Sequence, residues 1–200
     1  MRLSCLVAFA LLLFYGQACS AAISDEVFAF DGVKIGVTTL AEVQARYGKT
    51  KMVRTAKEDG APVAGCYYFA EAKQRMFIIF ESGALGGWDR VTALRISTKP
   101  MGNDCVSTKD NVAITPGHGV RLGQNVKEFK QKVDVVFKRT GNTLGYIGES
   151  KRAATAEEMK RMQAVFPGEK QIEFDVVVII KAKFDANRLT DYRVSKTESF

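Results

Sequence analysis

The sequence predicts an α+β fold made of two tandem repeats, each with a helix packed on an antiparallel sheet of three to four strands. Three observations support this: a nine-residue phrase occurs twice, a glycine-flanked motif occurs twice, and each motif precedes a similar order of helix and strand patterns. Internal repeats constrain architecture more strongly than any local pattern. Two copies indicate two similar small modules and exclude a solenoid.

The longer phrase runs from Asp89 to Ser97 and returns from Asn187 to Ser195, 98 positions later, with four identical residues. The shorter motif, Gly32 to Gly36, corresponds to Gly119 to Gly123. Most of the other positions in the longer phrase are conservative exchanges. The sequence therefore indicates a tandem duplication.

These matches divide the chain into four segments: a signal peptide at 1–22, a first α+β repeat at 23–98, a linker at 99–117 and a second α+β repeat at 118–200. The linker has the proline and glycine content of a loop. Its length exceeds that of ordinary connections, which indicates tethering or function.

The first segment is typical of an export signal. Arg2 precedes an apolar run from Leu3 to Tyr15, and small residues then suit cleavage after Ser20 or Ala22. The run is too short to span a hydrocarbon core of about 30 Å, so we expect no transmembrane helix. We expect a periplasmic protein, with secretion or outer-membrane association as alternatives.

A lipid anchor at Cys19 is not favoured. Gly16 and Gln17 stand where an aliphatic residue is expected upstream of a lipidated cysteine. Removal of the leader leaves Cys66 and Cys105, and an even pair in an oxidising compartment predicts a disulfide. Two buried free thiols would be the alternative in a cytosolic protein.

The first repeat opens with short strands around Asp31-Gly32, which suits a tight turn. Thr39 and Glu42 form a capping box, which predicts a helix that ends at Gly48. Strands are expected at 65–69, 75–80 and 89–97, joined in part by a loop at 81–88.

The second repeat follows the same order. Asn125 and Glu128 form its capping box. Strands are expected at 143–150, 174–184 and 187–195, with a turn at 185–187. An extra helix over 153–166 starts at Thr155 and Glu158, and its apolar stripe is expected to cover the second sheet.

The predicted strands carry apolar residues on both faces. Ile78 and Phe80 point one way, while Phe77 and Ile79 point the other. The face away from the helix must therefore be covered by the other module, by another chain or by a partner. If a partner covers it, Tyr67, Tyr68 and Trp88 are the candidate anchors, because aromatic residues dominate binding hot spots. Burial in the core is the alternative role for these rings.

Motifs for catalysis, metal or cofactor binding are not recognised. His118 is the single histidine, which is too few for the common zinc sets. No nucleophile elbow occurs, and Gly83 to Gly87 lacks the ending of a phosphate loop. Acidic residues are plentiful, but no spacing singles out a carboxylate pair for glycoside cleavage. The sequence therefore predicts no enzyme, no cofactor and no metal site, with an unrecognised hydrolase of cell-wall polymer as the alternative.

The net charge of +7 is dispersed along the chain. Nucleic acid would require a basic stripe with interleaved aromatics, so it is not an expected partner. A basic exported chain would be attracted to an acidic protein, an anionic membrane surface or a cell-wall polymer.

The segment from Ile35 to Val43, with Thr38-Thr39 before the helix and Gly48 after it, resembles the small outer-membrane-assembly lipoprotein (BamE/SmpA-like) family. Two such modules in one exported chain resemble the β-lactamase inhibitory protein fold. The second copy departs from the pattern at Gln124-Asn125 and at Asp134. The resemblance implies a binding protein that acts through a sheet surface; it carries over no β-lactamase target.

Together these features predict an exported, non-catalytic protein-binding module of the cell envelope, such as an inhibitor or immunity protein for an envelope enzyme. An outer-membrane-associated structural or assembly factor is the alternative.

Overall fold

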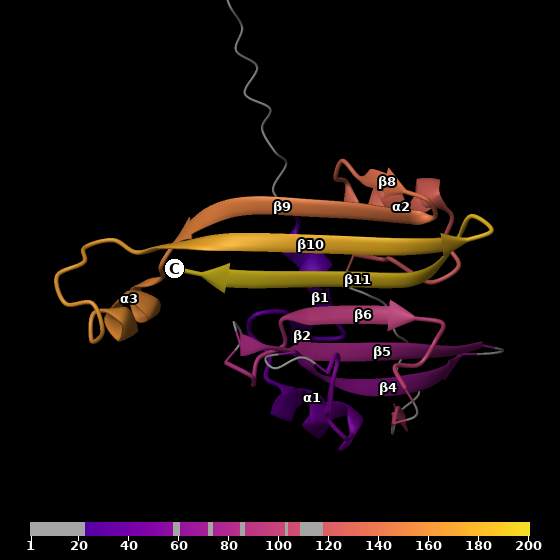
Figure 1. Ribbon diagram of the computed structural model, residues 1–200, viewed down its shortest axis with the longest axis horizontal. Helices are drawn as coiled ribbons and strands as arrows, with labels where there is room; N and C mark the ends of the chain where they lie inside the picture. Colours follow the sequence, from indigo (N-terminus) through magenta and orange to yellow (C-terminus); the bar gives the residue numbers. More distant parts are fainter. Residues whose placement is uncertain (1–22, 58–60, 72–73, 85–86, 103, 109–117) are drawn as a thin grey trace, which may run out of the picture.

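The computed structural model describes residues 23–57, 61–71, 74–84, 87–102, 104–108 and 118–200 (Figure 1). The predicted signal peptide lies outside these residues. The helices are the 3₁₀ turn η1 (Asp25–Phe28) and the α-helices α1 (Leu40–Tyr47), α2 (Val126–Val133) and α3 (Ala156–Met162). The strands are β1 (Ala29–Phe30), β2 (Val33–Lys34), β3 (Val53–Arg54), β4 (Val63–Glu71), β5 (Gln74–Ser82), β6 (Ala93–Ser97), β7 (Val106–Ser107), β8 (Lys138–Thr140), β9 (Thr143–Ala153), β10 (Glu173–Asp185) and β11 (Arg188–Ser199).

The α+β class is confirmed, and the sheet is mostly antiparallel. One nine-stranded sheet runs in the order β3-β4-β5-β6-β11-β10-β9-β8, with β7 paired to β4 in parallel. The sheet is continuous because β6 pairs with β11 at its centre (Figure 1). The two predicted repeats therefore meet edge to edge. Among the described helices, none has the length and apolar character to cross a membrane.

The three predicted capping boxes start the three α-helices. The carboxylates of Glu42, Glu128 and Glu158 accept the backbone N–H of the N-cap residue at 2.7, 3.0 and 2.8 Å. Each box satisfies donors that the first helical turn leaves without a partner. At the C-cap of α2, Asp134 adopts φ 42°, a left-handed conformation that aspartate tolerates.

Helices α1 and α2 pack on the same face of the sheet. Tyr47 of α1 stacks on Phe80 of β5, with ring centroids 5.6 Å apart. Phe129 of α2 lies edge-on to Tyr192 of β11 at 5.8 Å. One cluster of buried apolar residues includes side chains from both helices and from both sides of the β6–β11 pair. The main core is therefore shared by the two halves.

Helix α3 differs from the prediction in length and in packing. It is shorter than 153–166, it buries no residue, and Val165 and Phe166 after it are 67% and 41% exposed. The prediction that this segment covers the second sheet is wrong. Strands β9 and β10 extend past the core, so the connection between them lies beyond one end of the sheet (Figure 1).

The face opposite α1 and α2 is called the open face below. Side-chain alternation and strand register assign to it Ala64, Cys66, Tyr68, Phe77, Ile79, Glu81, Ala93, Arg95, Ser97, Ile147, Glu149, Lys151, Asp175, Val177, Ile179, Lys181, Lys183, Asp191, Arg193, Ser195 and Thr197.

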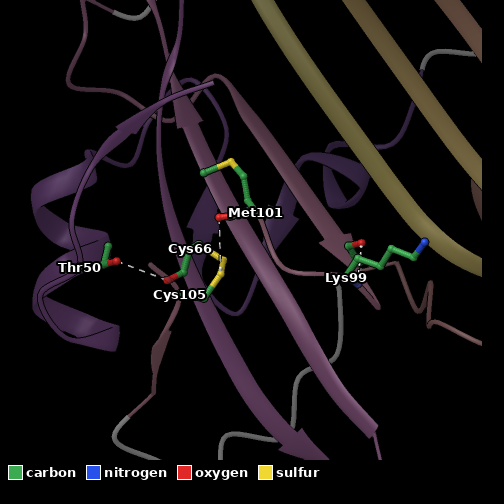
Figure 2. Close-up of a disulfide and its surroundings, with 6 residues drawn as sticks. Thr50, Cys66, Lys99, Met101 and Cys105 are labelled. Atoms are coloured by element: carbon green, nitrogen blue, oxygen red, sulfur yellow. Dashed lines mark hydrogen bonds between the residues drawn. A yellow bond between two sulfur atoms is a disulfide. The ribbon is translucent and has the colours of Figure 1, made fainter. Parts of the chain in front are cut away.

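The predicted disulfide between Cys66 and Cys105 is present, with a Cα–Cα distance of 4.5 Å (Figure 2). It fixes the chain after β6 against the open face of the first half. Met101 and Cys105 there pack against a small cluster that contains Phe77 and Ile79. A connecting segment covers this part of the sheet, whereas the sequence predicts that the other module, another chain or a partner covers it.

Removal of the disulfide should destabilise the protein substantially. The bridge joins cysteines 39 positions apart. Its loss should lower the free energy of unfolding by about 4 kcal/mol, because the unfolded chain regains loop freedom. Urea denaturation of the C66A/C105A variant measures this loss. A change below about 1 kcal/mol would show that the segment stays in place without the covalent link.

Candidate binding surface

No core cluster of the described residues covers the open face of the second half. Ile147 of β9 is 67% exposed, and Ile179, its neighbour on β10, is half-buried. Lys181 and Lys183 follow on the same side of β10 and are exposed. The surface thus combines an apolar pair with two cations.

Three cations stand side by side across the centre of the open face. Arg95 of β6 is the register partner of Arg193 of β11, and Arg193 is the partner of Lys181 of β10. Like charges directly opposite each other destabilise a sheet. The pairing of β6 with β11 therefore requires carboxylates close to this row.

Glu81 of β5 neutralises Arg193 across the intervening strand β6. The guanidinium donates through Nε to Oε1 at 3.1 Å and through Nη2 to Oε2 at 2.7 Å, a two-point contact. The Glu81 side chain is only 9% exposed. Hydrogen bonding to Glu81 raises the pKa of Arg193 above its ordinary value. This pair ties the first half of the sheet to the second.

Arg95 is neutralised by Asp191 of β11. Its Nε donates to Oδ2 at 2.8 Å, and Nη2 lies 2.6 Å from the same oxygen. Lys181 and Lys183 form no ion pair with the described residues. Lys183 lies opposite Asp191 in the register, whereas Lys181 stands beside the apolar pair with no carboxylate directly opposite it.

A cavity of about 380 Å³ lies at the end of the open face where Arg95, Asp191 and Lys183 meet. Lys99 contributes a further cation, Asp185 contributes a second carboxylate, and Ser97, Thr98, Thr190 and Asn142 contribute polar groups. The lining therefore carries both signs of charge, and its guanidinium already donates to Asp191.

The three aromatic residues that the sequence proposed as anchors do not form one surface. Tyr67 is fully buried, and its hydroxyl donates to the Gly48 carbonyl at 3.0 Å. Burial raises its pKa to about 12. Tyr67 thus belongs to the core, which is its alternative role.

The neighbouring Tyr68 points to the opposite face. It is half-buried, with its ring 6.3 Å from that of Phe77 and the Arg75 guanidinium 5.1 Å from its ring centroid. Trp88 lies in the loop before β6 and is 42% exposed. Both side chains are accessible to solvent. Tyr68 lies on the first half of the sheet and Trp88 in a loop, so neither lies on the open face of the second half.

Sequence reasoning missed the central arginines. Arg95 and Arg193 occupy the same place in the repeated phrase, which was a usable signal. Only the strand order reveals that they lie opposite each other, because a strand pattern does not specify the neighbouring strand.

The carboxylates at the base of α3 are held ionised. Arg152 donates two hydrogen bonds to Glu158, each at 2.8 Å, and also pairs with Glu198. These contacts lower the pKa of Glu158 to about 2. Burial acts to raise the pKa of Glu198, but hydrogen bonds from Arg152 and Lys196 lower it overall. The pair is therefore arranged for ion pairing and is poorly suited to donate a proton.

His118 lies on the helix side of the sheet, with Nε2 3.2 Å from the Tyr192 hydroxyl. Burial lowers its pKa to about 4, with the Glu26 backbone acting in the opposite sense. The imidazole is neutral in the folded protein at neutral pH. In the part of the chain that the structure describes, no three His, Cys, Asp or Glu side chains gather as metal ligands would.

Comparison with known proteins gives no relative: no protein-family model, curated protein or solved structure matches this chain.

Removal of Arg193 tests the central ion pair. R193A leaves the buried Glu81 carboxylate without its partner and should cost about 3 kcal/mol of unfolding free energy. R161A is the matched control, because its pair with Glu157 is an exposed i, i+4 contact worth less than about 0.5 kcal/mol. Urea denaturation compares the two, and equal losses would contradict the role assigned to Arg193.

Proposed function

We propose that the chain is an exported, non-catalytic protein-binding module of the cell envelope that uses its open face, in the manner of an inhibitor or immunity protein. The observation that supports this most directly is the open face of the second half, where exposed Ile147 and half-buried Ile179 lie beside two lysines that form no ion pair with the described residues. Interface cores combine apolar contact with a polar rim, and this surface has both.

We further propose that the two halves arose from one duplicated α+β unit. The Gly36 N–H donates to the Val91 carbonyl at 2.7 Å, and the Gly123 N–H donates to Leu189 at 2.8 Å. These pairs join corresponding places of the two repeated motifs. Their recurrence supports two units with the same local structure.

A second matching contact supports the same origin. The Arg90 guanidinium donates to the Gly36 carbonyl at 3.5 Å, and that of Arg188 donates to Gly123 at 3.0 Å. In a duplicated protein the two units can diverge separately. Here the disulfide-bonded segment covers the open face of the first half, and the open face of the second half is available for a partner.

The charges favour a partner with an acidic surface. Lys181 and Lys183 lie on β10, next to the apolar pair Ile147 and Ile179. Binding of a partner would remove water from this pair. Electrostatic complementarity raises the association rate and selects partners of opposite charge.

Affinity capture from envelope extract tests this function. The chain should recover a stoichiometric protein partner, and K181E/K183E should weaken capture at least about tenfold, because both cations would face an acidic surface with the wrong sign. Titration of the recovered partner against each variant measures the effect.

The matched control is K127E/K130E, which makes the same change in charge on the exposed side of α2. Recovery of no stoichiometric partner would contradict the proposed function. Equal weakening by both double variants would show that net charge, and not the open face, attracts the partner.

A further inference from the structure

The two outer edges of the sheet are protected differently. On the first side, β4 is bordered by β3 at Val63 and Ala64 and by β7 at Tyr67 and Tyr68. On the other side, β8 pairs only with residues 143–145 of β9. Among the described residues, nothing pairs with the outer side of Tyr146–Ala153.

This open stretch of β9 is long and regular. Its inner side pairs with β10 without interruption as far as Ala153. It spans about 27 Å at the usual rise per residue of an extended strand. The exposed backbone groups of such an edge form a template for another strand, and natural proteins usually shorten or cover edges of this kind.

The side chains of this edge are complementary to themselves. On the open face, Ile147, Glu149 and Lys151 follow one another at alternate positions. If a second β9 lies antiparallel with Ser150 opposite Ser150, each Glu149 faces Lys151 of the copy and each Lys151 faces Glu149. Opposite charges directly across two strands stabilise the pairing.

The other nearby registers lack this match. Centring the pair on Glu149 places two carboxylates opposite each other, and centring it on Lys151 places two ammonium groups together. Centring it on Gly148 puts both charges opposite uncharged residues. All of these registers keep the open faces of the copies on one side, but the Ser150 register alone places each Glu149 opposite an ammonium group. That group belongs to Lys151, which also lies 3.8 Å from Glu173 and 3.9 Å from Asp175 of its own chain.

We propose that β9 pairs with β9 of a second copy of this chain, antiparallel about Ser150, and thereby extends the sheet across a two-fold axis. The interface uses the outer edge of β9, so the central surface on β10 stays free. The inference is independent of the binding function proposed above.

Directed cross-linking tests the register. Two copies of S150C lie opposite each other on the two-fold axis, at a spacing that a disulfide can bridge. A153C is the matched control, because its two copies would lie about 20 Å apart along the strands. Under mild oxidation S150C should form a covalent dimer, and A153C should not.

Charge reversal tests the contacts without cysteine chemistry. By sedimentation, the unmodified chain should associate, and E149K or K151E should raise the dimer dissociation constant about tenfold, because each change occurs twice in a symmetric dimer. The double variant E149K/K151E exchanges the charges and should restore association.

A chain that stays monomeric at millimolar concentration would overturn the proposal. So would S150C that cross-links no faster than A153C, or a double variant as weak as the single ones. Capture of a different protein along this edge in place of the second copy would also count against it.

Discussion

The pairing of β6 with β11 is the constraint on which the rest of the structure depends. It joins strands that lie about a hundred residues apart and places Arg95 directly opposite Arg193. The backbone ladder gains hydrogen bonds, but the two guanidinium groups repel each other. Glu81 and Asp191 remove this conflict. Glu81 does so from β5, so the ion pair also reinforces the connection between the halves.

The same pairing explains how one sheet serves two purposes. The two halves lie side by side in one sheet and share a core on the helix side. The opposite side is therefore one continuous surface, and neither half lies over the other there. The first half closes its share with the segment that Cys105 fixes to Cys66. The second half lacks such a cover among the described residues, so Ile147 and the lysines of β10 remain available for contact.

Local signals in the sequence were reliable. The capping boxes at Thr39, Asn125 and Thr155 started helices where predicted, because the residues that decide a helix start are neighbours in the chain. The cysteine pair also followed from counting. The apolar alternation in β5 gave the two buried faces, since a period of two identifies which residues share a side.

Contacts between residues far apart in the chain could not be predicted as well from the sequence. Alternation does not show which strand lies beside which, so the edge-to-edge joining of the halves was not predicted. The apolar stripe near Met162 predicted a helix packed on the sheet. Strands β9 and β10 extend beyond the core, so the helix between them lies past the end of the sheet and buries no residue. Tyr67 and Tyr68 differ by one position, and only the register decided which of them is buried.

The most direct test of this account is whether the two halves unfold together. Fluorescence of Trp88 reports on the first half, and hydrogen exchange of the β10 amides reports on the second. A shared core and a central ion pair predict one denaturant midpoint for both probes and an equal shift of both in R193A. Two separate transitions, with β10 unaffected by loss of the first half, would contradict the central role of the β6–β11 pair.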